Sequence, residues 1–272
     1  MGNWKLSVEV VNVRKDVRMR VETDSMMSSA WILVYLLPIL LAVLWVSIFI
    51  VAIISFRVTV TPTPPSGQPI PTILLAPILA SIALLYGFMI VGLIVNIILI
   101  YKLVNRRNTH FKRQIFLFED IVAAAKAIAT KRGVDAEISL ASCDRTVRET
   151  KAEETEKGAV LWAILSAFIS PAIWYVWYFL MKDFYKHERR EDGFWEDVGR
   201  VLDKSGIKFS VPRRTEPLPE RSFALYLILT IITLGFFGIY WLYVLLKDPN
   251  QHFMYHLQTE DQLLTSLETG AV

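Results

Sequence analysis

The sequence predicts a mostly α-helical, polytopic integral membrane protein, and three observations carry this prediction. Hydrophobic residues make up 54% of the 272 positions. The mean hydropathy is positive, which is unusual for a water-soluble domain. The apolar residues form four charge-free runs of at least 24 residues: Ala30 to Phe56, Thr72 to Tyr101, Gly158 to Met181 and Ser222 to Leu246. Since about 20 helical residues cross the hydrocarbon core, each run is long enough to span it.

The first two runs predict a transmembrane helical hairpin over residues 30–101. The linker between them, RVTVTPTPPSGQPIP at residues 57–71, holds one basic residue and five prolines. Such a segment is typical of a short external loop. The tail before the hairpin and the basic segment after it then lie on the cytosolic side, where the positive-inside rule places Lys and Arg.

The last two runs are interrupted near their centres, one at Ser170-Pro171 and the other at Gly235 and Gly238. Because proline and glycine break helices, each run predicts either a kinked span or a re-entrant hairpin. Re-entry of both runs places 28 basic residues inside and 1 outside, against 18 and 11 for two spans. The charge distribution therefore favours re-entry. A turn at mid-membrane depth opposes it, because lipid cannot satisfy exposed backbone groups.

An internal repeat follows three of the apolar runs. Aligning Tyr101, Tyr178 and Tyr243 brings His110, His187 and His252 to one shared position without gaps. Glu-Asp pairs follow each histidine, at Glu119-Asp120, Glu196-Asp197 and Glu260-Asp261. Each pair belongs to an apolar-periodic stretch that ends at a glycine, at Gly133, Gly206 or Gly270. This pattern predicts amphipathic cytosolic helices with glycine stops.

Four short segments with alternating polarity predict a small β cap on the cytosolic side. They are KLSVEVV (5–11), DVRMRVE (16–22), VDAEISL (134–140) and IKFSV (207–211). The predicted organisation is a β-hairpin at 1–25, the transmembrane hairpin at 30–101, a helix–strand module at 102–157, a membrane segment with a second such module at 158–211, and a membrane segment with an amphipathic helix at 221–272.

The three repeated histidines are the candidates for chemistry, since histidine with carboxylates binds metal ions or relays protons. Their Glu-Asp pairs lie eight or nine residues away, whereas ligands on one helical face are spaced by four. A site at His110, His187 and His252 requires the three repeats to converge around one axis. The alternative is a histidine at each lipid–water interface, bonded to a helix end. We therefore expect no metal site and no cofactor.

Two further groups of residues are expected to contact the membrane. The segment KLVNRRNTHFKR (102–113) is basic and suits anionic lipid headgroups, through Lys102, Arg106, Arg107, Lys112 and Arg113. Ordinary positive-inside residues are the alternative. Aromatic residues at the ends of the last two runs predict interfacial anchors, at Trp174, Trp177, Tyr240, Trp241 and Tyr243.

The segment TLGFFGIYWLY, residues 233–243, resembles the signature of an uncharacterised prokaryotic membrane-domain family of unknown function. Members carry Thr-Leu-Gly, an aromatic or isoleucine pair, Gly and then Tyr-Trp. The resemblance covers residues 221–262, with a degenerate copy at 158–200 in which Ser-Pro replaces the glycine break. It implies a membrane domain and no particular activity.

No catalytic motif is present, so the sequence does not predict an enzyme. A net charge of +3 excludes the strong basic field of a nucleic-acid binder. The single cysteine, Cys143, is expected to be a spectator thiol. We expect a scaffold or anchor in the cytoplasmic membrane, with both termini cytosolic, that docks a protein partner or a second copy of itself. The alternatives are a small channel or transporter with a hydroxyl-lined path and a membrane-shaping protein with re-entrant hairpins.

Overall fold

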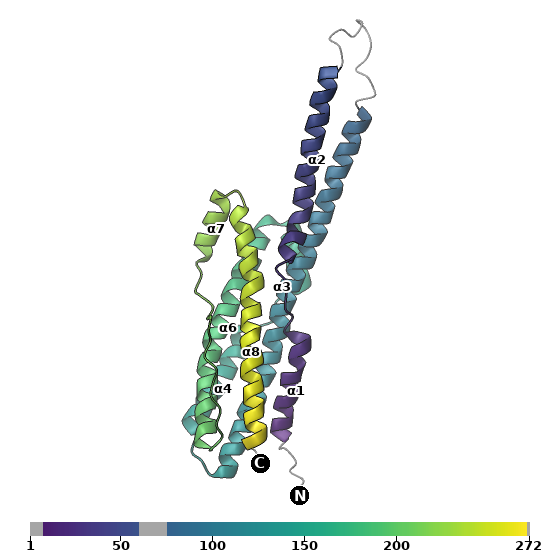
Figure 1. Ribbon diagram of the computed structural model, residues 1–272. Coiled ribbons are helices and arrows are strands. Elements are labelled where there is room, and N and C mark those ends of the chain that lie inside the picture. Colours follow the sequence, from purple (N-terminus) through teal and green to yellow (C-terminus); the bar gives the residue numbers. More distant parts are fainter. Residues whose placement is uncertain (1–7, 60–74, 271–272) are drawn as a thin grey trace.

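A computed structural model describes residues 8–59 and 75–270, and this part of the chain is helical throughout its regular structure (Figure 1). Its helices are α1 (Val8–Thr23), α2 (Trp31–Thr59), α3 (Leu75–Arg132), α4 (Glu137–Glu153), α5 (Ala159–Phe168), α6 (Ser170–Lys204), α7 (Phe223–Ile232) and α8 (Phe236–Gly270). The mostly α-helical fold is confirmed.

Three long helices, α3, α6 and α8, run side by side and form the centre of an elongated bundle (Figure 1). Helix α1 packs against α3 and α8, and α4 packs against α3 and α6. Helix α1 begins and α8 ends at the same, lower end of the bundle (Figure 1). The three central helices carry His110, His187 and His252, the histidines that the predicted repeat aligns.

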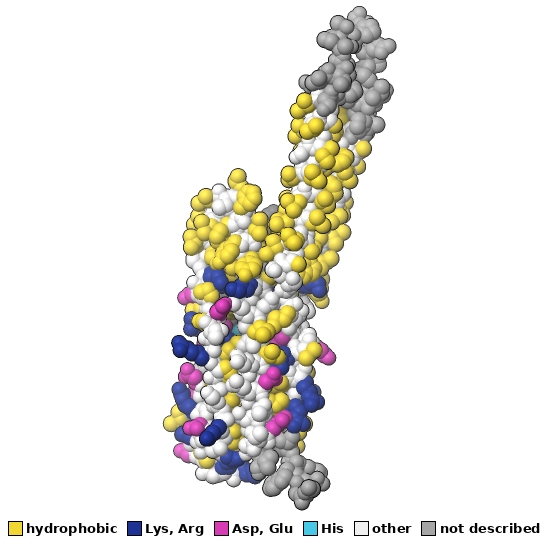
Figure 2. Space-filling model, in the orientation of Figure 1, with side chains coloured by type: hydrophobic (Ala, Val, Ile, Leu, Met, Phe, Trp, Pro, Cys, Tyr) yellow, Lys and Arg dark blue, Asp and Glu magenta, His cyan; other side chains and the backbone are white. Residues whose placement is uncertain are grey.

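The opposite end of the molecule is apolar on its surface. Helix α2 and the first part of α3 form a hairpin that extends beyond the bundle, and hydrophobic side chains cover it (Figures 1 and 2). Two stretches are long and apolar enough to cross a membrane, Trp31–Ile54 and Ile78–Arg132. Below the apolar region, Lys and Arg side chains appear on the surface (Figure 2). The length and exposure of these two helices support a membrane protein.

The two interrupted runs are each divided into a short and a long helix. Helix α5 ends at Phe168, Ile169 is extended, and Pro171 stands in the first turn of α6. Helix α7 ends before a turn in which Leu234 and Gly235 have φ of 50° and 95°. In both places the chain reverses and forms a helical hairpin (Figure 1). The predicted breaks at Pro171 and Gly235 therefore lie at the turns. Gly238 lies within α8, where a Cβ atom would meet Thr230 Cγ2 at 3.4 Å.

The turn between α7 and α8 satisfies its own backbone donors. The N–H of Gly235 donates to Thr230 O (2.8 Å), and that of Leu234 donates to Ile231 O (3.1 Å). The N–H of Phe237 donates to the hydroxyl of Thr233 (2.9 Å). These hydrogen bonds require a positive φ at residue 235, and glycine adopts positive φ without a steric cost. Lipid cannot satisfy exposed backbone N–H groups, but at this turn acceptors within the protein satisfy these three.

The predicted β cap is wrong for the described residues. Where the hairpin at 1–25 was predicted, residues 8–23 form helix α1, while residues 1–7 lie outside the described residues. Val10, Val13 and Val17 lie buried on one face of this helix. The alternating pattern misled because valines at i, i+3 and i+7 also fit a helix. The segment at 134–140 enters α4 at Glu137, and residues 207–211 are extended without pairing into a strand.

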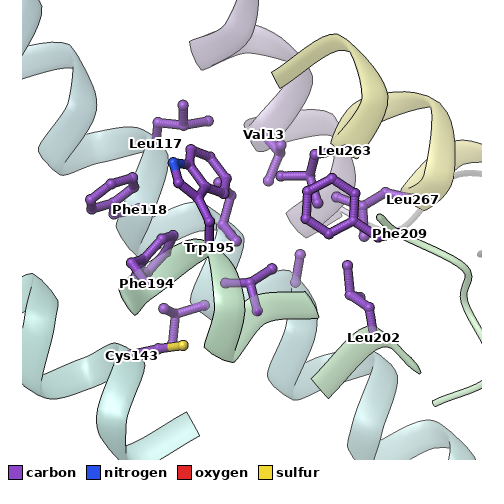
Figure 3. Close-up of a cluster of buried hydrophobic side chains, with 14 of the residues drawn as sticks. Val13, Leu117, Phe118, Cys143, Phe194, Trp195, Leu202, Phe209, Leu263 and Leu267 are labelled. Atoms are coloured by element: carbon purple, nitrogen blue, oxygen red, sulfur yellow. The ribbon is translucent and has the colours of Figure 1, made fainter. Parts of the chain in front are cut away.

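A hydrophobic core fills the bundle at the end away from the apolar hairpin. Figure 3 shows side chains from α1, α3, α4, α6, α8 and the 205–222 segment meeting around Trp195, including Phe118, Phe194, Phe209 and Leu263. Cys143 lies in this core, and burial raises the pKa of its thiol to about 12. The thiol is therefore un-ionised at neutral pH, as a spectator would be.

Candidate metal centre

All four histidines of the chain converge at one buried point in the bundle. His110 comes from α3, His187 from α6, and His252 and His256 from α8. Each is at most 1% exposed. One ring nitrogen from each lies within 4.8 Å of the others. Helices α3, α6 and α8 thus bring His110, His187 and His252 together, which is the convergence that a site at these histidines requires.

A second layer of side chains lies beside the histidines. Four residues after His110, His187 and His252, the three helices carry Gln114, Glu191 and His256. A spacing of four places these side chains one helical turn further along the same face. All three are buried. The centre therefore consists of two layers of side chains from α3, α6 and α8.

A carboxylate holds the Nδ1 atom of each histidine. This orientation points the Nε2 atoms toward the centre, as is usual for metal-binding histidines with carboxylate partners. The pairs are His110 with Asp24 (2.9 Å), His187 with Glu154 (2.9 Å), His256 with Glu260 (2.9 Å) and His252 with Glu188 (3.4 Å).

Several of the atoms that face the centre lack a hydrogen-bond partner. Nε2 of His187, Nε2 of His256 and Oε2 of Glu191 are buried without a hydrogen bond, and so is Oε1 of Gln114. Glu191 Oε2 lies 2.7 Å from His256 Nε2 and 3.4 Å from His187 Nε2. The Nε2 atoms of His110 and His252 are 3.2 Å apart. Buried polar atoms without partners are costly, and here they gather at one point.

Four arginines bind the outer side of these carboxylates. Arg113 bridges Asp24 (2.8 Å) and Glu260 (2.9 Å), and Arg20 also contacts Glu260 (3.3 Å). Arg190 pairs with Glu154, and Arg214 pairs with Glu188 (3.2 Å) and with Glu191. Each of the five carboxylates around the histidines thus has at least one guanidinium partner.

The electrostatics keep His110, His252 and His256 neutral. Burial lowers the pKa of His110 to about 4 and lowers the pKa values of His252 and His256 well below the usual range. A neutral imidazole is the form that binds a metal ion. Burial also raises the pKa of Glu260 to about 7, against the effect of Arg113. Burial alone would raise the pKa of Asp24, but His110 and Arg113 outweigh it and lower that pKa.

Three residues predicted to contact lipid headgroups point into the bundle instead, so that prediction is wrong for them. Arg106, Arg107 and Arg113 are at most 2% exposed, whereas Lys102 and Lys112 are exposed. Arg106 donates to the carbonyl of Leu245 (2.7 Å). Pro249 lacks the N–H that would normally bond that carbonyl within α8, so Arg106 replaces a missing helical donor.

Arg107 is also held inside the bundle. It binds Asp183 on α6 (2.9 Å) and donates to the carbonyl of Thr155 (2.7 Å). Its guanidinium lies over the ring of Phe111, 4.3 Å from the ring centre. These contacts connect α3, α6 and the segment after α4, which explains why basic residues near the apolar region are buried.

The Glu-Asp pairs of the repeat do not gather into one site. Glu260 belongs to the centre, but Asp261 pairs with Arg20 (2.9 Å) on the surface. Glu119 pairs with Lys151, and both carboxylates of the Glu196-Asp197 pair contact Arg200. Asp120 lies beside Asp16 of α1. Glu119 and Asp261 thus join neighbouring helices, Glu196 and Asp197 pair within α6, and Glu260 alone belongs to the centre.

The aromatic residues divide between the interior and the surface. Trp177 and Trp241 are buried and meet edge to face, with ring centres 5.1 Å apart, while Trp174 is partly buried and stacks on Trp241. Tyr240 and Tyr243 are exposed. An interfacial anchor must reach the surface, so the prediction is wrong for Trp177 and Trp241, which instead join α6 to α8.

Two residues of this centre could have been predicted from i, i+4 spacings in the sequence. The spacing His252-x3-His256-x3-Glu260, together with His187-x3-Glu191, places ligand atoms on one helical face. These two patterns identify His256 and Glu191, which the repeat alignment alone does not. Asp24 and Glu154 lie outside the central helices and carry no such pattern.

Comparison with known proteins supports the predicted family resemblance. The model of one family, a domain of unknown function (DUF4234), matches residues 221–266. The match covers α7 and most of α8, and so includes His252, His256 and Glu260. No curated protein and no solved structure matches the chain significantly.

Proposed function

We propose that this is a membrane protein whose polar bundle binds one divalent transition-metal ion. The ligands are Nε2 of His110, His187, His252 and His256, with Glu191 as a carboxylate ligand. The observation that carries the proposal is the inward set of four buried imidazoles, each oriented by a carboxylate, with unpartnered polar atoms of Gln114 and Glu191 beside them.

The dimensions and the donor chemistry support a metal ion. Ligand atoms about 2.1 Å from an ion lie at most about 4.2 Å apart, so separations up to 4.8 Å need only small side-chain shifts. Imidazole with a carboxylate suits zinc, iron, cobalt or nickel. Without a bound ion, the orphaned polar atoms cost about 1–3 kcal/mol each.

Such an ion joins the three repeats into one unit. Its ligands come from α3, α6 and α8, and their carboxylate partners Asp24 and Glu154 extend the network to α1 and α4. Because binding free energy at a site assembled only on folding stabilises the fold, the ion holds the modules in one arrangement. This role agrees with a scaffold that presents the bundle to a protein partner or to a second copy.

Metal content of the purified full-length protein tests the proposal. We expect about one transition-metal ion per chain by plasma mass spectrometry after purification in mild detergent without chelators. His187→Ala and His252→Ala should lower it to near zero, while Gln262→Ala, at an exposed position of α8, should retain it. A wild-type protein that stays metal-free after incubation with zinc, iron, cobalt and nickel salts contradicts the proposal.

We propose further that the α5–α6 and α7–α8 hairpins enter one leaflet of the membrane without crossing it. Helices α5 and α7 have 10 residues each. At about 1.5 Å per residue, each reaches about half of a hydrocarbon core about 30 Å thick. The tips are apolar and open, with Leu234 91% and Phe236 76% exposed. The α2–α3 hairpin then provides the spanning helices, and α1 and the end of α8 stay on the cytosolic side.

Cysteine accessibility in intact cells tests this topology. In a chain carrying Cys143→Ser, Gly193→Cys places a thiol on the exposed side of α6, where a Cβ atom meets nothing within 4 Å. We expect protection from a membrane-impermeant maleimide, while Ser66→Cys, in the predicted external linker, is labelled. Labelling at residue 193 in sealed cells contradicts re-entry.

The half-depth hairpins favour a second candidate function, membrane shaping. Both insert apolar volume into the leaflet beside the bundle and none into the other leaflet. Reconstitution into liposomes tests it, with narrowing into tubules or small vesicles as the expected result. Replacement of the exposed tip residue Leu234 by Asp should abolish narrowing, because a buried carboxylate opposes insertion.

A further inference from the structure

The segment between α6 and α7, residues 205–222, lies along the bundle and covers one side of the metal centre. Ile207 and Phe209 anchor its start in the hydrophobic core. Further on, the N–H of Leu218 donates to Glu188 Oε1 at 2.6 Å. Between these anchors the segment turns Arg214 inward, and the side chain of Arg214 is only 9% exposed.

Arg214 stands between solvent and the two acidic residues of α6 that face the centre. Its guanidinium binds Glu188 Oε2 (3.2 Å) and Glu191 Oε1, and its Nε donates to Asp192 (2.8 Å). The guanidinium also lies over the ring of Tyr255, 3.5 Å from the ring centre. Glu191 therefore has Arg214 on one oxygen, and its other oxygen points at His256 and His187.

A surface hollow leads to this point. It is lined by Glu188, Arg213, Arg214, Gln251 and Tyr255, among others. Elsewhere the centre is covered by protein: the rings of Phe111, Phe184 and Phe253 pack on one side, and α1 and α4 cover Asp24 and Glu154, which are at most 5% exposed. In the described part of the chain, the hollow thus brings solvent to a first carboxylate of the centre, with Arg214 in between.

We propose that the metal ion reaches the centre through this hollow, and that Arg214 is a positioning residue that holds Glu191 toward the ion and closes the route. This inference rests on the proposed metal-binding function. Movement of Arg214 away from Glu188 and Glu191 opens a path lined by two carboxylates, which attract a cation. Its return covers the bound ion and supplies the charge partner for both carboxylates.

The rate at which bound metal leaves the protein tests this role. The full-length protein is loaded with Co²⁺, whose d–d absorption reports ligation by histidine, and is then mixed with excess EDTA. We expect Arg214→Ala to lose Co²⁺ about tenfold faster than wild type or more, in the range typical for loss of an outer partner of a metal ligand. Arg213→Ala, which removes the same charge from the same hollow, should release it at the wild-type rate.

Equilibrium loading separates this inference from the metal-binding proposal. We expect one Co²⁺ per chain in wild type, Arg214→Ala and Arg213→Ala alike, with only the release rate changed. A wild-type release rate in Arg214→Ala overturns the role of Arg214 and leaves metal binding intact. If Arg214→Ala does not load, Arg214→Lys decides: faster release supports the closure, and the wild-type rate overturns it. A wild-type protein that never loads overturns the metal-binding proposal itself.

Discussion

The two ends of α3 follow opposite rules of burial. Toward its start, Leu79, Met89 and Ile90 are more than half exposed although they are apolar. Further along the same helix, Arg106, His110 and Arg113 are at most 2% exposed although they are polar or charged. The first pattern suits a lipid environment, and the second suits a bundle in water with a polar interior.

The difference teaches what each environment requires of the fold. The apolar end is stabilised by lipid and by satisfied backbone groups, and it needs little side-chain burial. The polar end places many charges out of water, which is tolerable only if each charge has a partner. Its stability should therefore depend on individual ion pairs, whereas the apolar end should depend on backbone geometry.

Removal of Arg113 should have the largest effect. Arg113→Ala leaves Asp24 and Glu260 buried without their shared guanidinium. Loss of one partner from a buried ion pair typically costs about 3–5 kcal/mol. We expect the unfolding midpoint in detergent, followed by circular dichroism, to fall by about 10 °C or more. Lys112→Ala, at the exposed neighbouring position, serves as the control and should change it little. Equal midpoints for the two variants would show that the polar end does not depend on this ion pair.

Some residues of the candidate metal centre could be predicted from the sequence, and others could not. Alignment of the three tyrosines predicts that His110, His187 and His252 occupy equivalent places, because a repeat that folds alike places equivalent residues around one axis. Asp24 and Glu154 could not be predicted, since they depend on how α1 and α4 dock onto the central helices. The β cap failed for a related reason: alternation in a short segment does not decide between strand and helix without knowledge of the packed face.

Backbone geometry at the hairpin turn should have an intermediate effect. Gly235→Ala forces a Cβ atom onto a residue with φ of 95°, although nothing lies within 4 Å of it. Strain of this kind costs about 1–3 kcal/mol. Gly87, within α3, has equally open surroundings but helical geometry, so Gly87→Ala is a matched control. Alanine there should be neutral or stabilise by up to about 1 kcal/mol. A common response of both variants would mean that the turn is not held as the structure has it.

Removal of a like-charge contact should have the smallest effect, and in the opposite direction. Asp16 of α1 is buried, and burial together with Asp120 raises the pKa of its carboxyl to about 6. Because the folded state holds this proton more tightly than the unfolded chain, the carboxyl favours folding below about pH 4, and that contribution is lost as the pH rises through about 6. The asparagine in Asp16→Asn stays uncharged at every pH. At pH 7 the variant therefore avoids a buried negative charge, and it should be more stable than wild type by about 1–2 kcal/mol.

The pH dependence of the difference between Asp16→Asn and wild type separates this effect from a general change in packing. The advantage of the variant should be constant above about pH 7, decline between about pH 6 and pH 4, and disappear below. Glu119→Gln, at an exposed carboxylate paired with Lys151, should show no such profile. If the difference in free energy of unfolding between Asp16→Asn and wild type is the same at pH 4 and pH 7, it arises from packing. The polar end of the bundle would then tolerate a carboxyl group without a charged partner.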